Sequence, residues 1–129
     1  MSSPAAAREG LTLPVERRIR HKTQFDRVYA EGRRFGDAFF GVIARANETD
    51  GPRLGMAIAS KVAGNSVQRN RIRRIIRESF RLRQHLLPRV DLVVGARARV
   101  RGAPSAELRA SLDALWEQVT KRCASSPRA

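Results

Sequence analysis

One segment, Ser66 to Arg83 (SVQRNRIRRIIRESFRLR), restricts the possible folds of this chain more than any other. Advancing by 100° per residue, as an α-helix does, gathers its apolar side chains in one arc of roughly 160°. They are Ile72, Ile75, Ile76, Phe80 and Leu82. Seven arginines share the segment with a single acidic residue, Glu78. The pattern predicts a helix over residues 66–84 with one side in a hydrophobic core and a basic ridge on the other.

Two further helices are predicted, one toward each end of the chain. The first begins at Thr23, whose hydroxyl can form a reciprocal cap with Asp26, and it ends at Gly32 in the left-handed conformation. Phe25, Val28 and Tyr29 share one side of it. The last helix runs from about residue 105 to residue 122. Its apolar stripe has the helical period and consists of Leu108, Leu112, Leu115, Trp116 and Val119.

Three strands are predicted between the helices. Alternating side chains indicate strands over residues 35–46 and 53–60, which the turn-forming sequence NETDGP separates, and residues 91–98 form the third. Phe39 and Phe40 should point to opposite faces of the sheet. Gly64 to Ser66 is expected to be a loop and helix cap. The order helix–strand–strand–helix–strand–helix predicts an α/β fold, a two-layer α+β sandwich.

The length of 129 residues fits one domain. We expect residues 1–13 to be a disordered N-terminal segment, residues 14–122 a single domain and residues 123–129 a disordered tail. A lone cysteine, Cys123, cannot form an internal disulfide, so a reducing cytoplasm is expected. No apolar run approaches the ~20 residues of a membrane span, and the N-terminus shows no secretory pattern.

The formal net charge of +14 favours a polyanionic partner, because so much like charge on a small domain repels itself. Arg69, Arg73, Arg77 and Arg81 form a like-charge row at a spacing of four residues, which weakens an isolated helix. A merely solvated helix face usually mixes signs, so this row favours phosphate binding. Asn70 lies within the ridge, where its amide can hydrogen-bond a base edge or a sugar hydroxyl.

The residue types used in protein-based hydrolysis are present but are not arranged for it. His21 and His85 are isolated, and Cys123 lies near the apolar stripe of the last helix, as a buried or idle thiol would. No spacing of His, Cys, Asp or Glu matches a metal motif. The carboxylates are scattered, whereas a metal-dependent nuclease needs them clustered. We therefore predict no catalytic residue and no metal site in the protein itself.

The basic helix also carries a recognisable signature. The run from Arg69 to Arg74, RNRIRR, continuing to Arg77, resembles the RNR signature of the bacterial ribonuclease P protein. Three flanking segments are similar to the same family: QFDRVY at 24–29, GMAIASK at 55–61 and DLVVGAR at 91–97. Together the resemblance covers about residues 14–122.

The resemblance implies a particular fold and partner. The family fold is an α/β sandwich like the second domain of a small-subunit ribosomal protein, with the signature helix in a left-handed βαβ crossover, which is rare. Nothing in the sequence itself gives the handedness. The family's partner is ribonuclease P RNA, which with magnesium removes the 5′ leader of precursor tRNA, and other structured RNAs are further expected substrates. The protein is a non-catalytic cofactor of this endoribonuclease, expected to be monomeric alone and cytoplasmic in a bacterium.

The resemblance also assigns residues to two RNA contacts. Contact with the catalytic RNA is expected at Lys61, Arg69, Asn70, Arg71, Arg73, Arg74, Arg77 and Arg81. A cleft for the leader is expected at Phe25, Tyr29, Phe40 and Ile43. From the residues alone, Phe25 and Tyr29 fit core packing as well as base stacking.

Two positions depart from the family pattern, and two other functions fit the composition. Ser60–Lys61 stands where the family often has two basic residues, and Ile43 stands where it often has an aromatic side chain. A ribosomal protein or another basic RNA chaperone would share the charge, and only the signature helix and its flanks argue against it. A DNA-binding protein is disfavoured because no dimerisation heptad or helix-turn-helix unit accompanies the basic helix. The sequence does not define the substrate range or the stoichiometry of the holoenzyme.

Overall fold

The computed structural model describes residues 13–124, which form one sheet with helices on both of its faces. The strands are β1 (Arg33–Gly36), β2 (Phe40–Ala46), β3 (Arg53–Ala57) and β4 (Val90–Ala96). The helices are α2 (Lys22–Glu31), α3 (Ser60–Ala63), α4 (Ser66–Arg83) and α5 (Ser105–Ala124). Three short 3-10 turns complete the fold, η1 (Val15–Arg17), η2 (Gln84–Leu86) and η3 (Ala98–Val100). The predicted α/β class is confirmed.

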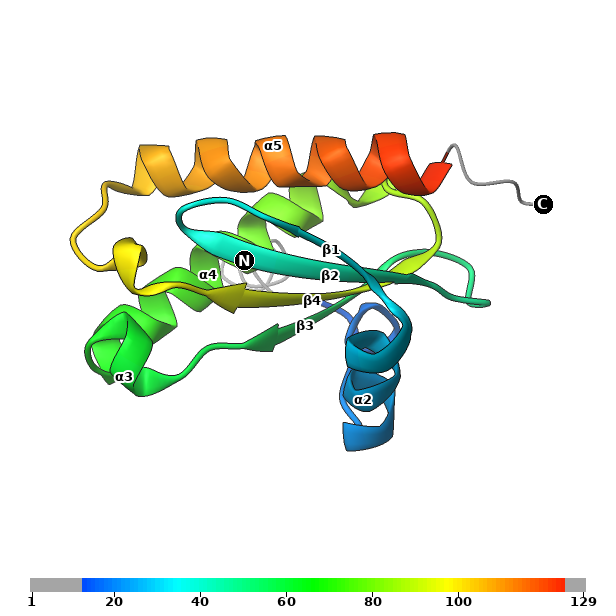
Figure 1. Cartoon of the computed structure of the whole chain (residues 1–129), viewed down its shortest axis with the longest axis horizontal. Coiled ribbons are helices and arrows are strands. Elements are labelled where there is room, and N and C mark those ends of the chain that lie inside the picture. Colours follow the sequence, from blue (N-terminus) through cyan, green and yellow to red (C-terminus); the bar gives the residue numbers. More distant parts are fainter. Residues whose placement is uncertain (1–12, 125–129) are drawn as a thin grey trace, which may run out of the picture.

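The last strand, β4, lies inside the sheet, whose order is β1-β2-β4-β3. It pairs antiparallel with β2 and parallel with β3. The connection from β3 to β4 passes through α3 and α4. In Figure 1 both strands run from right to left, β4 lies above β3 and α4 lies behind the sheet, so the crossover is left-handed, against the usual rule.

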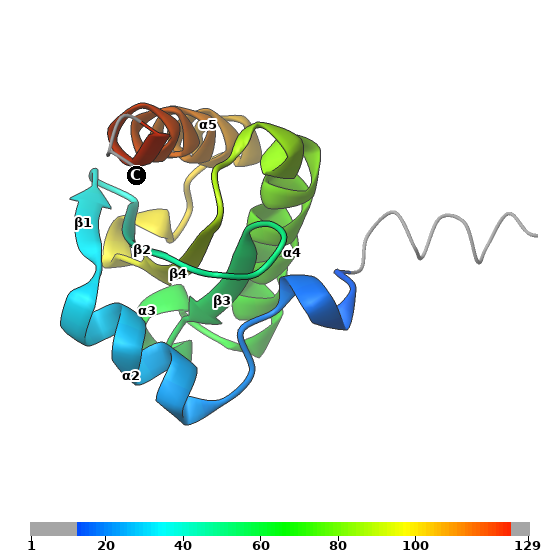
Figure 2. The ribbon, with the colours of Figure 1, turned by 90° about the vertical axis from the view of Figure 1, so that its right-hand side faces the viewer.

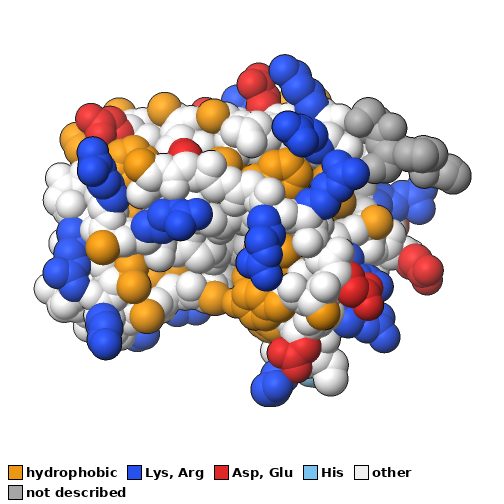
Figure 3. Space-filling model, in the orientation of Figure 1, with side chains coloured by type: hydrophobic (Ala, Val, Ile, Leu, Met, Phe, Trp, Pro, Cys, Tyr) orange, Lys and Arg blue, Asp and Glu red, His pale blue; other side chains and the backbone are white. Residues whose placement is uncertain are grey.

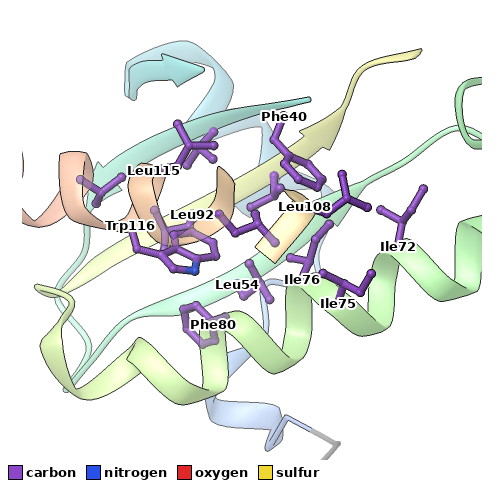
Figure 4. Close-up of a cluster of buried hydrophobic side chains, with 14 of the residues drawn as sticks. Phe40, Leu54, Ile72, Ile75, Ile76, Phe80, Leu92, Leu108, Leu115 and Trp116 are labelled. Carbon is purple, nitrogen blue, oxygen red and sulfur yellow. The ribbon is translucent and has the colours of Figure 1, made fainter. Parts of the chain in front are cut away.

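The main core lies between one face of the sheet and the pair α4 and α5, while α2 covers part of the opposite face (Figure 2). Figure 4 shows the side chains of the sheet, α4 and α5 meeting in this core. Trp116 is buried there, and its indole Nε1 donates a hydrogen bond to Ser79 Oγ at 2.7 Å. A smaller cluster under α2 consists of Ile19, Val28, Ile43 and Val93, with Phe25 packed against it.

The predicted strand over residues 35–46 is wrong, because this segment is a hairpin of β1 and β2. Asp37 makes the turn, since its Oδ1 accepts hydrogen bonds from the backbone N–H groups of Phe39 and Phe40 at 2.9 and 3.0 Å. The predicted strand over residues 53–60 ends early at Ala57, and α3 follows it. Phe39 lies in the turn and packs partly buried against the main core, so the predicted split of the two phenylalanines between the faces does not hold.

Both predicted ends of the first helix need correction. The helix begins at Lys22 with His21, not Thr23, as its N-cap, and Gln24 Oε1 accepts from the backbone N–H groups of Arg20 and His21 at 3.0 Å each. Gly32 is extended, with φ −82° and ψ 160°, because the chain enters β1 directly. Glycine is needed there for space, since a Cβ would lie 2.5 Å from Ile43 Cγ2 and 2.6 Å from the Val28 carbonyl oxygen.

Two burial expectations and the end of the last helix also change. Leu82 is exposed at the edge of the apolar arc of α4, and Ser79 is buried instead because Trp116 hydrogen-bonds it. Leu13, assigned to the disordered segment, is buried in the main core. The helix α5 extends to Ala124, and Cys123 packs partly buried against the core. The predicted disorder of residues 1–12 and 125–129 lies outside the described residues.

Candidate nucleic-acid interface

Helix α4 presents the basic ridge as the sequence predicted. Asn65 caps its start, with Oδ1 accepting from the backbone N–H of Gln68 at 2.8 Å. Burial of its apolar arc fixes the rotation of the helix, so Asn70 and Arg74 are exposed on the outer side. Four more arginines are half-buried along its length: Arg69, Arg73, Arg77 and Arg81.

The ridge lacks neutralising carboxylates within residues 13–124. Glu78, the one acidic residue of α4, pairs with Arg109 of α5 at 3.1 Å, and Asp113 of α5 lies 3.6 Å from Arg83 at the end of the helix. None of the predicted RNA-contacting arginines, and not Lys61, takes part in an ion pair in this part of the chain. A row of cations with no internal partner is a surface suited to an external polyanion.

Arg71 differs from the rest of the ridge because it is used inside the protein. Its Nη2 donates to the Ala103 carbonyl oxygen at 2.8 Å and to Ser105 Oγ at 3.2 Å. These bonds tie α4 to the start of α5. Lys61 lies on α3 with its side chain exposed, and the guanidinium of Arg101 donates to its backbone carbonyl.

Three arginines meet in a hollow between α4 and β3. Arg73 and Arg77 line it together with Arg18, which precedes α2, and the ring of Phe25. Burial lowers the pKa of Arg77 from its ordinary value, and the positive charges of Arg73, Arg18 and Arg74 lower it further. The guanidinium still remains charged at neutral pH, because arginine is effectively always protonated in proteins. An anion in the hollow would relieve this repulsion.

A second hollow of about 290 Å³ lies on the α2 face of the sheet. Its floor is built from small side chains, Gly41, Ala57 and Gly95, and Tyr29 stands at its α2 side. In Figure 3 basic side chains border the apolar and uncharged surface beside α2. The hollow is an open groove that two aromatic residues, Tyr29 and Phe35, and two arginines line together with small and aliphatic residues.

Arginines that the sequence analysis did not select line this groove. Arg34 and Arg97 are both exposed, and Arg97 Nη2 lies 2.6 Å from the point where a Cβ of Gly36 would stand. The guanidinium of Arg97 fits there because Gly36 has no side chain. Strand alternation could have identified Arg34, because it shares one face of the sheet with Gly36, Gly41 and Gly95. This inference is possible only once β1 is recognised as a separate strand. Arg18 was missed because it precedes every predicted element.

Phe25 and Tyr29 both keep accessible ring surface. Tyr29 is 42% exposed. Phe25 is half-buried, and its ring lies on Gly55, where a Cβ would come within 2.8 Å of Phe25 Cζ. Phe25 lines the three-arginine hollow and Tyr29 lines the groove. The two aromatic residues that were predicted for one leader cleft therefore line two different depressions.

Phe40 was placed in the cleft wrongly. It is fully buried in the main core with Val42 and Ala44, on the sheet face opposite α2 (Figure 4). The strand alternation explains this, because Gly41 and Ile43 take the α2 face. Ile43 does line the groove, but it is only 8% exposed because α2 covers most of it.

No acidic site accompanies these surfaces in the described part of the chain. Among residues 13–124, no three His, Cys, Asp or Glu side chains gather at one place. The buried carboxylate Asp91 is bound by Arg53 at 2.8 and 2.7 Å and by the Asn47 amide at 2.8 Å. This bidentate pair raises the pKa of Arg53. Within the same residues, no helix is long and apolar enough to cross a membrane.

Comparison with known proteins connects this geometry to one family. The family described as ribonuclease P matches residues 13–120. A ribonuclease P protein component of Thioalkalivibrio sulfidiphilus is 42% identical over 113 residues, covering 87% of this chain and 93% of the relative. That of Escherichia coli O157:H7 is 38% identical over 108 residues, covering 84% and 91%.

Solved structures agree with the sequence relatives. The Staphylococcus aureus RNase P protein superposes with a TM-score of 0.75 at 31% identity, covering 79% of this chain and 94% of that one. The Thermotoga maritima RNase P protein gives 0.72 at 28% identity, covering 79% and 96%. The chain belongs to the family of bacterial ribonuclease P protein components, whose ribonucleoprotein is the endoribonuclease of tRNA 5′ processing.

Proposed function

We propose that this chain binds the catalytic RNA of ribonuclease P and the 5′ leader of precursor tRNA, and thereby promotes removal of the leader. The observation that carries the proposal is the α4 ridge, whose arginines have no carboxylate partner in the described residues. It borders a hollow that also contains an aromatic ring, Phe25. One face of the protein thus offers cations for phosphates next to rings for bases.

The α4 ridge is the proposed contact with the catalytic RNA. Arg69, Arg73, Arg74, Arg77 and Arg81 supply guanidinium groups for backbone phosphates, and the exposed Asn70 supplies an amide for a base edge or sugar hydroxyl. Lys61 extends the contact onto α3. Arg71 acts mainly as a positioning residue, because its guanidinium already binds Ala103 and Ser105.

The proposed leader contact is the groove and the two rings beside it. Unpaired bases stack on the accessible faces of Phe25 and Tyr29. The glycine and alanine floor admits a strand close to the sheet, and Arg34 and Arg97 lie where its phosphates would run. Ile43 offers only the exposed edge of its side chain.

Hydrolysis is proposed to belong to the RNA partner. Bound magnesium ions supply activated water and stabilise the leaving oxygen in such reactions. The described residues do not build a site for them, because the acids are dispersed and Asp91 is saturated by Arg53 and Asn47. What this chain contributes is binding and orientation. Other structured RNAs with an unpaired 5′ extension are further expected substrates.

Reconstitution tests the proposal. The full chain is mixed with bacterial ribonuclease P RNA and a leader-bearing precursor tRNA at low magnesium. We expect cleavage at the mature 5′ end only when both components are present. Cleavage by the protein alone, or no stimulation of the RNA by the protein, would reject the proposal. The free chain should sediment as a 14.4 kDa monomer, and fractionation of the bacterium should recover it from the cytoplasm.

A further inference from the structure

A third basic depression lies away from the groove, where α4 ends. It has a volume of about 630 Å³ and opens between η1, the turn from β2 to β3 and the end of α4. In Figure 1 this end of the molecule is opposite α3. Its charged lining consists of three arginines against one carboxylate, namely Arg17, Arg81 and Arg89 against Asp50. His85 lines it as well.

Arg17 is held in place by the turn. Its Nη1 donates to Asp50 Oδ1 at 3.1 Å, and its side chain is only 25% exposed, whereas that of Asp50 is 88% exposed. The guanidinium occupies the space above Gly51, where a Cβ would lie 2.9 Å from Nη1 and 3.0 Å from Cζ. The solvated Asp50 neutralises this cluster poorly, since exposed ion pairs are weak.

Arg81 and Arg89 add positive charge to the depression from the end of α4 and from the segment before β4. Arg81 projects from the last turns of α4, and its Nε is buried without a hydrogen-bond partner. A buried donor without an acceptor is costly, so an acceptor in the depression would stabilise it. Arg89 is exposed, and its backbone is fixed because its carbonyl accepts from the Asn47 N–H at 3.0 Å.

We infer that this depression binds a backbone phosphate of an RNA strand, through the guanidinium groups of Arg17, Arg81 and Arg89. The inference deepens the proposed function, on which it rests, by adding a second anchoring point remote from the leader groove. Guanidinium groups match phosphate oxygens in geometry and remain charged. The volume accommodates a phosphate with its sugar, since ligand sites begin at about 300 Å³.

Binding of ribonuclease P RNA to the full chain tests the inference. Arg17→Gln, Arg81→Gln and Arg89→Gln each remove one positive charge from the depression, and Lys121→Gln removes one from the exposed surface of α5 as the matched control. We expect each arginine variant to weaken binding about three- to tenfold and the control to change it less than twofold. The triple arginine variant should also show a salt slope shallower by about one.

Gly51→Ala separates the geometry of the depression from its net charge. The added methyl group occupies the place of the Arg17 guanidinium and leaves the charge of the protein at +14. The displaced atoms are the end of a flexible side chain, so the melting temperature should stay near that of the unchanged protein. We expect RNA binding to fall about threefold, and unchanged binding would show that the position of Arg17 is irrelevant and overturn the inference.

Inorganic phosphate provides the direct probe. Titration of the full chain should shift the Nε–H resonances of Arg17 and Arg81 saturably in NMR spectra, and Gly51→Ala should weaken the effect. A shift without saturation, or one equal to that of the exposed Arg99, would overturn the inference. Arg73→Gln, a variant of the α4 ridge outside the depression, distinguishes failure of the further inference from failure of the proposed function. If it weakens RNA binding while Arg17→Gln and Arg89→Gln, which lie outside the α4 ridge, match Lys121→Gln, only the further inference fails, and if none of the variants weakens binding, the proposed function fails too.

Discussion

The ring of Phe25 packs against the protein and also lines a basic hollow, so packing and the proposed base stacking concern the same side chain. One part of its ring lies on Gly55 and packs against the cluster of Ile19, Val28 and Val93. The remainder faces the hollow lined by Arg73 and Arg77. The sequence alone left core packing and base stacking open for Phe25, and the half-burial of the ring is compatible with both.

A substitution separates the two roles. Phe25→Ala should weaken binding of precursor tRNA to the reconstituted holoenzyme about tenfold, because stacking is worth about 1–3 kcal/mol per base and 1.4 kcal/mol is a factor of ten. Binding of mature tRNA, which has no leader, should not change. Val28→Ala is the matched control, since Val28 is fully buried on the same helix and its truncation should lower the melting temperature without selecting between ligands. Equal losses for both tRNAs in Phe25→Ala would leave the ring a packing residue.

Cys123 gives a prediction about pH. Burial raises the pKa of its thiol, and the charge of Arg33 offsets only part of that effect. At a given pH less thiolate is present than on a free cysteine, and the thiolate is the reactive form. Alkylation by iodoacetamide at pH 8 should therefore be slower than that of free cysteine, and its rate should rise with an inflection at higher pH. Mass spectrometry of the intact chain measures the rate, and reaction as fast as free cysteine would contradict the burial.

At the scale of the element, different sides of helix α4 make different contacts. Its apolar arc completes the main core, and Arg71, Glu78 and Arg83 contact α5 or the segment before it. The other arginines of the helix are exposed or half-buried. Side chains on the flank toward α5 are engaged by the protein, whereas Arg73 and Arg77 form no ion pair in the part of the chain that the structure describes. The position of an arginine around the helix axis therefore decides whether it bonds within the protein or is available to an external partner.

Alanine substitutions should reveal this difference. Arg73→Ala and Arg77→Ala should weaken assembly with ribonuclease P RNA and leave the melting temperature nearly unchanged, because neither forms an ion pair in the described residues. Arg71→Ala should instead lower the free energy of unfolding by about 1–3 kcal/mol, because it leaves the Ala103 carbonyl without its donor. RNA titration with thermal melting distinguishes them. Unfolding of Arg73→Ala or Arg77→Ala would place those side chains in the core.

The sequence predicted the long elements well and the short ones poorly. The helices α4 and α5 repeat the helical period over many residues, so their bounds were placed within about two residues. The strand β1 has four residues, too few to show an alternation of its own, and it merged with β2. The hydrogen bond that accompanies the burial of Ser79 comes from Trp116, which is 37 residues away and which a helical pattern within α4 does not reveal.

Candidate site residues were likewise predicted well where they lie on long elements and poorly where they depend on short ones. The ridge was found because it lies within α4, whereas Phe40 was misplaced because its face depended on the unrecognised hairpin. Arg34 and Arg97 lie on neighbouring parts of the groove only because β2 separates their segments and pairs with both. Sites assembled by pairing between distant strands need the sheet order, which composition and periodicity do not supply.

At the scale of the whole molecule, electrostatics should govern RNA binding. The net charge is +14, and the α4 ridge with Lys61 presents cations that form no ion pair within residues 13–124. If they neutralise roughly five or six phosphates, log affinity for ribonuclease P RNA should fall with log salt at a slope of about −4 to −5. Filter binding over a range of potassium chloride measures it. A slope near zero would reject an electrostatic interface.

The place of β4 inside the sheet has a consequence for how the protein is made. As the chain leaves the ribosome, β2 and β3 emerge first, but neither pairs with the other, because β4 lies between them. The arginine-rich segment of α4 is also synthesised before the strand and the helix α5 that fix it against the sheet. Until residues 90–124 have been added, the nascent chain carries most of its charge without the framework that orders it. The proposed RNA recognition should therefore be a property of the finished chain.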